Sequence, residues 1–286
     1  MKRVCAIVLY MLMYLSVAAG ERWAIVVGIG EYPNGAGWRK INGDNDIGII
    51  MPMLCRFGFP SSHINILQNE EATKQNIKNA VMELLPKLKS SDTFYFHFSG
   101  HGQLITDLDG DEEDGWDEAI IPYDARPSYD PDGYKGENHI VDDELNGWLL
   151  DVRRKVGPEG KILVVLDACH SGGGSRDEDE DVTVRGTADR FEIKSAAPKG
   201  PSAQRAVEWV CISACKSDQR NHEYKTDNGR QYGRLSWVLS RGLAPDMRAG
   251  ELERLINVQY KSLPLTPSPQ TAEMDCRLDM MNKPVL

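Results

Sequence analysis

The chain has 286 residues, of which 41% are hydrophobic and 27% are charged, a length and composition typical of a globular protein with a continuous core. Its formal net charge of −10 argues against binding to nucleic acid or to anionic membrane surfaces, because neutralising phosphates requires clustered Lys and Arg. Cationic substrates or metal ions are the more natural partners.

Residues 1–20 have the pattern of a cleavable signal peptide. Lys2 and Arg3 precede an apolar run, and the small residues Ala18, Ala19 and Gly20 follow it. The run holds about fourteen residues where a spanning helix needs about twenty, so we expect cleavage near Gly20, no stable membrane span, and a secreted or periplasmic protein. Cleavage would remove two positive charges and no acidic ones, taking the net charge from −10 to −12.

The cysteine count gives one constraint. Five of the six cysteines lie after Gly20, and an odd number leaves at least one thiol unpaired in a secreted protein. The other four could form disulfides or serve as small buried hydrophobic residues.

Short apolar runs alternate with longer amphipathic stretches along residues 21–286. Strands are predicted at residues 23–29, 63–67, 93–98, 162–166 and 209–213, and helices at 44–57, 73–88, 142–156, 233–241 and 250–263. This alternation predicts one α/β domain with a mostly parallel central sheet flanked by helices.

Two long connections interrupt the alternation, at residues 107–139 and 171–206. Both are rich in acidic residues and glycine, and both follow strands that end in chemically reactive residues. Long connections of this kind are usually functional or disordered, and in open α/β sheets the active site forms outside the carboxyl ends of the strands. We therefore expect these segments to shape the site.

Two motifs carry the candidate chemistry. Ser99-Gly100-His101-Gly102 follows one predicted strand, and Asp167-Ala168-Cys169-His170-Ser171-Gly172 follows another. A cysteine nucleophile needs a thiolate or a neighbouring imidazole that accepts its proton. Each motif alone is weak evidence, because isolated cysteines and histidines are more often structural.

Together and in this order, the motifs resemble those of the caspase-like cysteine peptidases, and most closely the metacaspases of type I without an interaction prodomain. The resemblance runs from about Arg22 to the end of the chain, with Ala168 standing where many metacaspases have Ser. It includes further matches at Asn45-Asp46, Arg56-Phe57-Gly58-Phe59, the acidic run 109–115, Asp142-Asp143-Glu144 and Ile212-Ser213-Ala214-Cys215. It implies a caspase-like sandwich fold and a thiol protease that hydrolyses polypeptides.

The resemblance assigns Cys169 as the nucleophile and His101 as its catalytic partner. It also implies that the backbone amides of Gly102 and Cys169 form the oxyanion hole. His170 is a rival base, but its position directly after the nucleophile makes alignment with the thiol awkward.

The resemblance further implies a substrate pocket formed by Asp46, Ser99 and Asp167, which would accept Arg or Lys before the cleaved bond. Carboxylates pair well with guanidinium and ammonium groups. Asp46 could instead cap the helix predicted to begin near it.

Calcium is the cofactor that the resemblance suggests, with Asp117, Asp142 and Asp143 as ligands and Asp177 as a less cleanly aligned fourth. The acidic segment from Asp107 to Asp117 supplies the oxygen ligands that calcium prefers, but it does not complete an EF-hand loop. A solvated acidic loop, and a capping role for Asp142, remain alternatives at this point.

Self-processing is expected in the segment 171–206, which holds basic residues that an acidic pocket would accept: Arg176, Arg185, Arg190, Lys194, Lys199 and Arg205. Its polar composition predicts that it is exposed and protease-accessible.

Alternative functions are a clostripain-like or gingipain-like peptidase of the same clan and a catalytically silent caspase-like scaffold. A nucleotide-binding domain is disfavoured, because the glycines after the first strand do not complete a phosphate loop.

Overall fold

The computed structural model describes residues 20–170, 183–193 and 207–286. The expected signal peptide falls outside these residues, except for Gly20. A six-stranded sheet in the order β11-β8-β7-β3-β1-β2 forms the centre of the molecule. Its strands are β1 (Arg22–Gly28), β2 (Ile64–Gln68), β3 (Thr93–Ser99), β7 (Lys161–Asp167), β8 (Val210–Ser213) and β11 (Glu273–Asp275). All neighbouring pairs are parallel except β11 with β8, so the mostly parallel sheet is confirmed.

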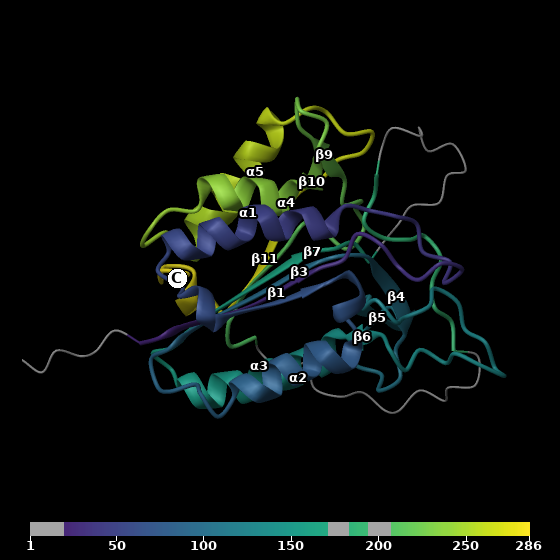
Figure 1. Ribbon diagram of the computed structural model, residues 1–286, viewed down its shortest axis with the longest axis horizontal. Helices are drawn as coiled ribbons and strands as arrows, with labels where there is room; N and C mark the ends of the chain where they lie inside the picture. The colour runs from purple at the N-terminus through teal and green to yellow at the C-terminus, as the bar shows by residue number, and fades with distance from the viewer. Residues whose placement is uncertain (1–19, 171–182, 194–206) are drawn as a thin grey trace, which may run out of the picture.

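Helices cover both faces of this sheet (Figure 1). One face carries α1 (Gly43–Arg56), α4 (Arg234–Gly242) and α5 (Ala249–Ser262), and the other carries α2 (Lys74–Leu84) and α3 (Asp142–Val156). Alternate residues of the buried strands feed the two cores, because successive side chains of a strand point to opposite faces. Thus Ile25 and Phe96 belong to the core beneath α2 and α3, whereas Val26 and Tyr95 belong to the core beneath α1, α4 and α5.

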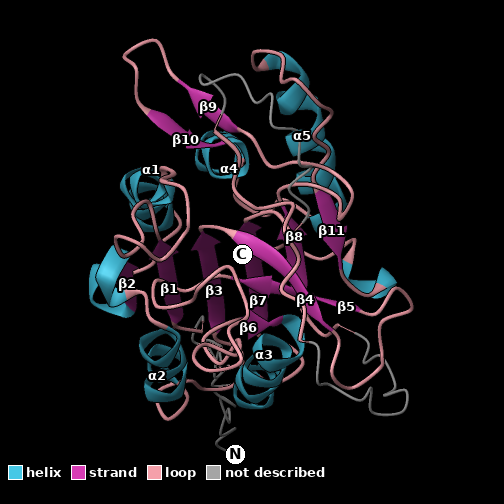
Figure 2. Ribbon diagram, turned by 90° about the vertical axis from the view of Figure 1, so that its right-hand side faces the viewer, coloured by secondary structure: helices cyan, strands magenta, loops and turns pink. Residues whose placement is uncertain are grey.

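Two smaller sheets were not anticipated from the sequence. Strands β4 (Gly102–Thr106), β5 (Trp116–Ile120) and β6 (Ile140–Val141) form an antiparallel sheet near the carboxyl ends of the central strands (Figure 2). Strands β9 (Glu223–Lys225) and β10 (Gln231–Gly233) form a hairpin. The connection 107–139 is therefore not a single irregular loop, since β5 lies within it.

The predicted element boundaries agree with the structure to within one or two residues, with one exception. The helix expected to reach Leu88 ends at Leu84. Pro86 follows two residues later, and its ring removes an amide donor and clashes with the preceding turn, which ends a helix.

The described part of the segment 171–206 corrects a second expectation. Residues 183–193 are not a freely exposed loop, because Arg185 and Phe191 are fully buried. Phe191 donates its amide to the Leu104 carbonyl at 2.8 Å and packs beside Ile105 and Tyr134. These apolar contacts and a bridge to the small sheet at Ile105 hold the segment against the domain.

Two further observations concern the described residues only. No helix among them is long and apolar enough to cross a membrane. No disulfide links their five cysteines, of which Cys169 and Cys215 are buried.

Candidate active site

The register of the central sheet brings the two predicted motifs together. Strands β3 and β7 are neighbours, and Ser99 pairs with Asp167 at their carboxyl ends. His101 and Cys169 each lie two residues beyond this pair. The backbones touch there: a side chain at Gly102 would place its Cβ only 2.6 Å from the carbonyl oxygen of Cys169. Glycine is therefore required at position 102.

His101 is held in an aromatic and almost fully buried environment. Its ring centroid lies 5.2 Å from that of Tyr32 and 5.0 Å from that of Trp38. Nε2 lies 2.8 Å from the Arg39 carbonyl oxygen, whereas buried Nδ1 has no hydrogen-bond partner among the described residues. Burial lowers the pKa of His101 to about 4, so the imidazole is neutral near pH 7.

The contact between Nε2 of His101 and the Arg39 carbonyl oxygen determines the tautomer of His101. A carbonyl oxygen can only accept a hydrogen bond, so Nε2 must carry the proton. In a neutral imidazole the other nitrogen, Nδ1, then has the free lone pair. His101 is thus prepared to accept a proton at Nδ1.

Cys169 lies two residues beyond the end of β7 and is 1% exposed. Its Sγ lies 2.9 Å from the carbonyl oxygen of Gln219, which a thiol can approach as a donor. The neighbouring His170 is also buried, and its Nδ1 lies 3.0 Å from a carboxylate oxygen of Glu118. Burial alone would lower the pKa of His170, but the charge and hydrogen bond of Glu118 outweigh it and raise that pKa. Nδ1 of His170 is engaged by the Glu118 carboxylate, so His170 is the weaker candidate for the base.

The three residues predicted to form a substrate pocket also meet. The Ser99 hydroxyl donates to Asp46 Oδ2 at 2.8 Å, and the Gly233 amide donates to Asp46 Oδ1 at 3.0 Å. Asp46 lies in the first turn of α1, where the N-cap is Asn42, so it does not cap the helix. Burial, together with the charge of Asp167, raises the pKa of Asp46 to about 6, although Arg185 opposes this shift.

Asp167 is fully buried on the adjacent strand and saturated with donors. It accepts hydrogen bonds from the Ser236 amide and hydroxyl and from Asn221 Nδ2, at 2.8, 2.6 and 2.7 Å. Burial disfavours the carboxylate, but the charge of Arg185 and these hydrogen bonds outweigh it and hold the pKa of Asp167 below its ordinary value. Asp167 is therefore an ionised carboxylate within the protein.

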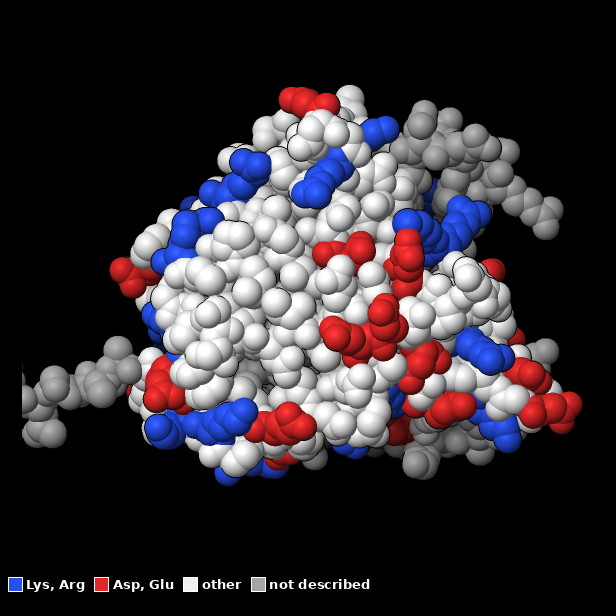
Figure 3. Space-filling model, in the orientation of Figure 1, with Lys and Arg blue, Asp and Glu red and all other residues white. Residues whose placement is uncertain are grey.

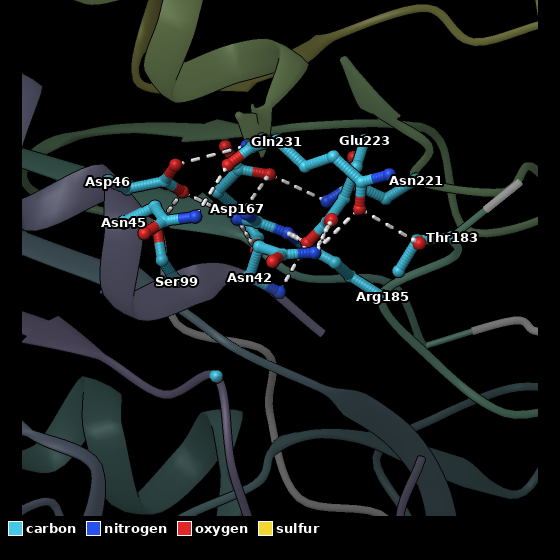
Figure 4. A network of polar contacts seen from close by, with 12 residues as sticks. Asn42, Asn45, Asp46, Ser99, Asp167, Thr183, Arg185, Asn221, Glu223 and Gln231 are labelled. Atoms are coloured by element: carbon cyan, nitrogen blue, oxygen red, sulfur yellow. Dashed lines mark hydrogen bonds and ion pairs between the residues drawn. The ribbon is translucent and has the colours of Figure 1, made fainter. Parts of the chain in front are cut away.

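This acidic pocket is filled by the chain's own Arg185 (Figure 4). Nη1 of Arg185 lies 2.6 Å from Asp46 Oδ2 and 3.4 Å from Asp167 Oδ1. Nε lies 3.0 Å from Oε1 of Glu223, a third carboxylate that the sequence did not reveal. Glu223 belongs to a short hairpin strand without a recognisable motif, so no pattern in the sequence placed it in the pocket.

The backbone around Arg185 is paired like a short antiparallel strand. The Arg185 amide donates to the Asn221 carbonyl at 2.9 Å, and the Glu223 amide donates to the Thr183 carbonyl at 3.0 Å. Gly186, the next residue, is pressed against Cys169: a Cβ there would lie 3.1 Å from Cβ of Cys169 and 2.4 Å from its carbonyl oxygen. The bond between Arg185 and Gly186 is thus next to Cys169, with the arginine side chain in the pocket.

A separate acidic cluster lies at the small sheet. Four residues place one carboxylate oxygen each within 4.8 Å of one another, namely Asp107, Asp109, Asp111 and Asp117. Of the three predicted calcium ligands, Asp117 belongs to this group. Asp142 and Asp143 do not, but their charges contribute to the raised pKa of Asp117, which burial and neighbouring carboxylates bring to about 8. Asp142 makes no capping hydrogen bond at the start of α3, and Asp177 falls outside the described residues.

Comparisons with known proteins agree with this geometry. The model of the metacaspase peptidase C14 domain matches residues 22–175. Metacaspase-2 of Arabidopsis thaliana is 38% identical over 161 residues, covering 54% of this chain and 35% of that protein. Metacaspase-1A of Aspergillus oryzae is 34% identical over 165 residues, covering 55% of this chain and 36% of that protein. The chain thus spans little more than a third of the length of these relatives.

A crystal structure of a protein from Geobacter sulfurreducens shares the fold, with a TM-score of 0.61 at 20% identity over 93% of this chain and 98% of that one. The family match covers the strands from β1 to β7 and the two motifs that hold His101 and Cys169. The chain therefore belongs to the metacaspase family of peptidases, through its C14 domain.

Proposed function

We propose that this protein is a cysteine endopeptidase that cleaves polypeptides after Arg or Lys, with Cys169 as nucleophile and His101 as its proton acceptor. The observation that carries the proposal is the guanidinium of Arg185 in a pocket of carboxylates, with its following peptide bond next to Cys169. Asp and Glu side chains also gather from the centre to the right of the face in Figure 3, the side toward which the central strands run. Such a surface attracts cationic peptides.

The thiol of Cys169 and the imidazole of His101 carry out the proposed hydrolysis. Nδ1 of His101 takes the thiol proton as Sγ of Cys169 attacks the scissile carbonyl carbon. The carbon–nitrogen bond then breaks, and the proton passes to the leaving amine. Water hydrolyses the resulting thioester and returns free Cys169. The close approach of Gly102 to Cys169 supports their amides as donors to the developing oxyanion.

Fluorogenic peptides that differ only in the residue before the cleaved bond test the specificity. We expect hydrolysis after Arg and Lys and none after Asp, since a carboxylate entering the pocket would meet the charges of Asp46 and Asp167. Assays with and without calcium should be run in parallel. Cleavage after Asp alone would overturn the basic specificity, and the absence of any hydrolysis would favour the silent scaffold.

Self-processing between Arg185 and Gly186 is the expected maturation step. Amino-terminal sequencing of the smaller fragment should begin at Gly186 in the wild type, and no such fragment should appear in Cys169→Ala. Arg185→Gln should abolish this cut, because an uncharged amide does not neutralise the buried carboxylates. Arg190→Gln is the matched control, since Arg190 lies in the same segment but stacks on Trp116 at 4.6 Å. A fragment that begins elsewhere, or an unchanged cut in Arg185→Gln, would contradict this assignment.

We also propose that calcium binds the acidic cluster. The residues fit the ion, because Asp107, Asp109, Asp111 and Asp117 each offer a carboxylate oxygen, the ligand that calcium prefers. Asp142 lies near enough to Asp117 for its charge to raise the pKa of that residue. Burial and the charges of Asp143, Glu118 and Glu112 raise the pKa of Asp142 itself to about 7. Calcium bound there would order the small sheet that carries Glu118, the partner of His170.

The affinity for calcium should rise with pH. Asp117, with a pKa of about 8, and Asp142, with a pKa of about 7, hold protons near neutrality. Calcium binds the ionised form and must displace these protons, so affinity should increase between about pH 6 and pH 8 and then level off. Calorimetry of Cys169→Ala in buffers of different ionisation enthalpy measures the released protons. Asp117→Asn should bind calcium more weakly and release fewer protons, and a pH-independent affinity would contradict the linkage.

The secreted or periplasmic location stays part of this proposal, on the strength of the predicted signal peptide. The scaffold alternative is less favoured because the nucleophile, the histidine and the pocket carboxylates are all present and brought together. The family match favours the metacaspase branch over the clostripain-like one.

A further inference from the structure

Glu223 contributes a third carboxylate to the pocket, from a different direction than Asp46 and Asp167. It is the first residue of β9, and its side chain is 1% exposed. Oε1 accepts from the Asn42 amide at 2.8 Å and Oε2 accepts from Asn42 Nδ2 at 2.6 Å. These two contacts fix the carboxylate beside the guanidinium. Asn42 therefore holds Glu223 in place independently of Arg185.

The three carboxylates contact two different atoms of Arg185. Asp46 and Asp167 both lie near Nη1, at the far end of the side chain, where the ammonium of a lysine could also be attracted. Glu223 accepts from Nε at 3.0 Å. Lysine has a methylene at the corresponding position, so it cannot make this hydrogen bond. Nη2 has no partner among the described residues, so Nε and Nη1 carry the recognition.

We propose that Glu223 is a specificity-determining residue, and that it makes the pocket select arginine over lysine in substrates. The inference rests on the proposed function, in which Arg185 occupies the place of a substrate residue. Arginine gains a charge-assisted hydrogen bond to a buried carboxylate. Lysine supplies no N–H at this position and leaves Oε1 with the Asn42 amide alone, and a site built to pair a ligand N–H rejects ligands that lack it.

The first test needs no variant of the protein. Three peptides carry arginine, lysine, or the amidine analogue of arginine in which a methylene replaces Nε, and kcat/KM is measured with the calcium-treated wild type. The amidine keeps the positive charge and both terminal nitrogens and loses only the Nε–H. We expect kcat/KM to be about 10- to 100-fold lower for the amidine than for arginine, a range typical of one charge-assisted hydrogen bond. Equal values for arginine and the amidine would overturn the inference.

Glu223→Gln tests the same contact from the protein side. The variant should lower kcat/KM for arginine and leave the amidine nearly unchanged, so that the preference between the two collapses. A merely structural role would lower both alike and keep their ratio. Asp46→Asn is the contrast, because Asp46 contacts the terminal nitrogen that both peptides share and should affect both equally.

Failure of the inference and failure of the proposed function give different results. Cleavage after arginine, lysine and the amidine at similar rates would keep the basic specificity and remove the role of Glu223. No cleavage after any of the three would overturn both.

Discussion

Replacing Cys169 by alanine is expected to reduce kcat/KM by about 10⁴-fold or more, because removing the nucleophile of a catalytic pair leaves only binding and oxyanion stabilisation. The same variant should stay uncut between Arg185 and Gly186. The side chain is small and lies at the end of a strand rather than within one. We therefore expect the melting temperature to fall by no more than about 4 °C, which corresponds to about 1 kcal/mol for a domain of this size.

Cys211→Ala is the matched control for this loss. Cys211 lies in β8, is partly buried and packs at the edge of a core, away from the catalytic pair. Like Cys169→Ala, this variant loses one thiol group, but it should keep wild-type kinetics. Substantial residual activity in Cys169→Ala would remove the nucleophile assignment, and a parallel loss in both variants would indicate a structural cause.

Replacing His101 by alanine should reduce kcat/KM by about 10²- to 10⁴-fold, the range typical of a lost general base. His170→Ala should cost less than about tenfold, since Nδ1 of His170 is engaged by the Glu118 carboxylate rather than available as a base. The cavity left by His101 lies beside the rings of Tyr32 and Trp38. Added imidazole could enter it and should restore part of the activity.

The ranking of the two histidines decides between the two bases. A larger loss in His170→Ala than in His101→Ala would transfer the role to His170. Imidazole provides an additional criterion, because it should have no effect on Cys169→Ala. The melting temperatures of both histidine variants should be compared, since both side chains are buried.

The elements of the central sheet could be predicted because their signals are local. Its five predicted strands come from apolar runs such as β3, whereas the sixth, β11, is a short polar segment that was not predicted. Helices such as α3 carry one apolar stripe with acidic residues in the first turn and basic ones in the last. The strands β4, β5 and β9 escaped prediction because they are short, partly exposed and rich in polar residues. Their pairing is decided by tertiary contacts rather than by periodicity.

The candidate site also contains residues that the sequence predicted and residues that it did not. Asp46, Ser99, His101 and Cys169 lie in motifs that the family resemblance identifies, and their proximity follows from strand order. Glu223 has no such signal, because its role depends on where the β9–β10 hairpin folds relative to α1. The burial of Arg185 could not be predicted either, because the polar composition of the segment 171–206 favours exposure.

Strands β7 and β8 are adjacent in the sheet, yet the bond between Arg185 and Gly186 lies between them in the chain. After cleavage there, Asp46 and Asp167 belong to one polypeptide, while Glu223, Asn221 and Ser236 belong to the other. Folding of the cut enzyme becomes a second-order reaction, because two molecules must meet before the sheet is complete. At low protein concentration each unfolding event would then be final, and the rate of unfolding would set the working lifetime of the cut enzyme.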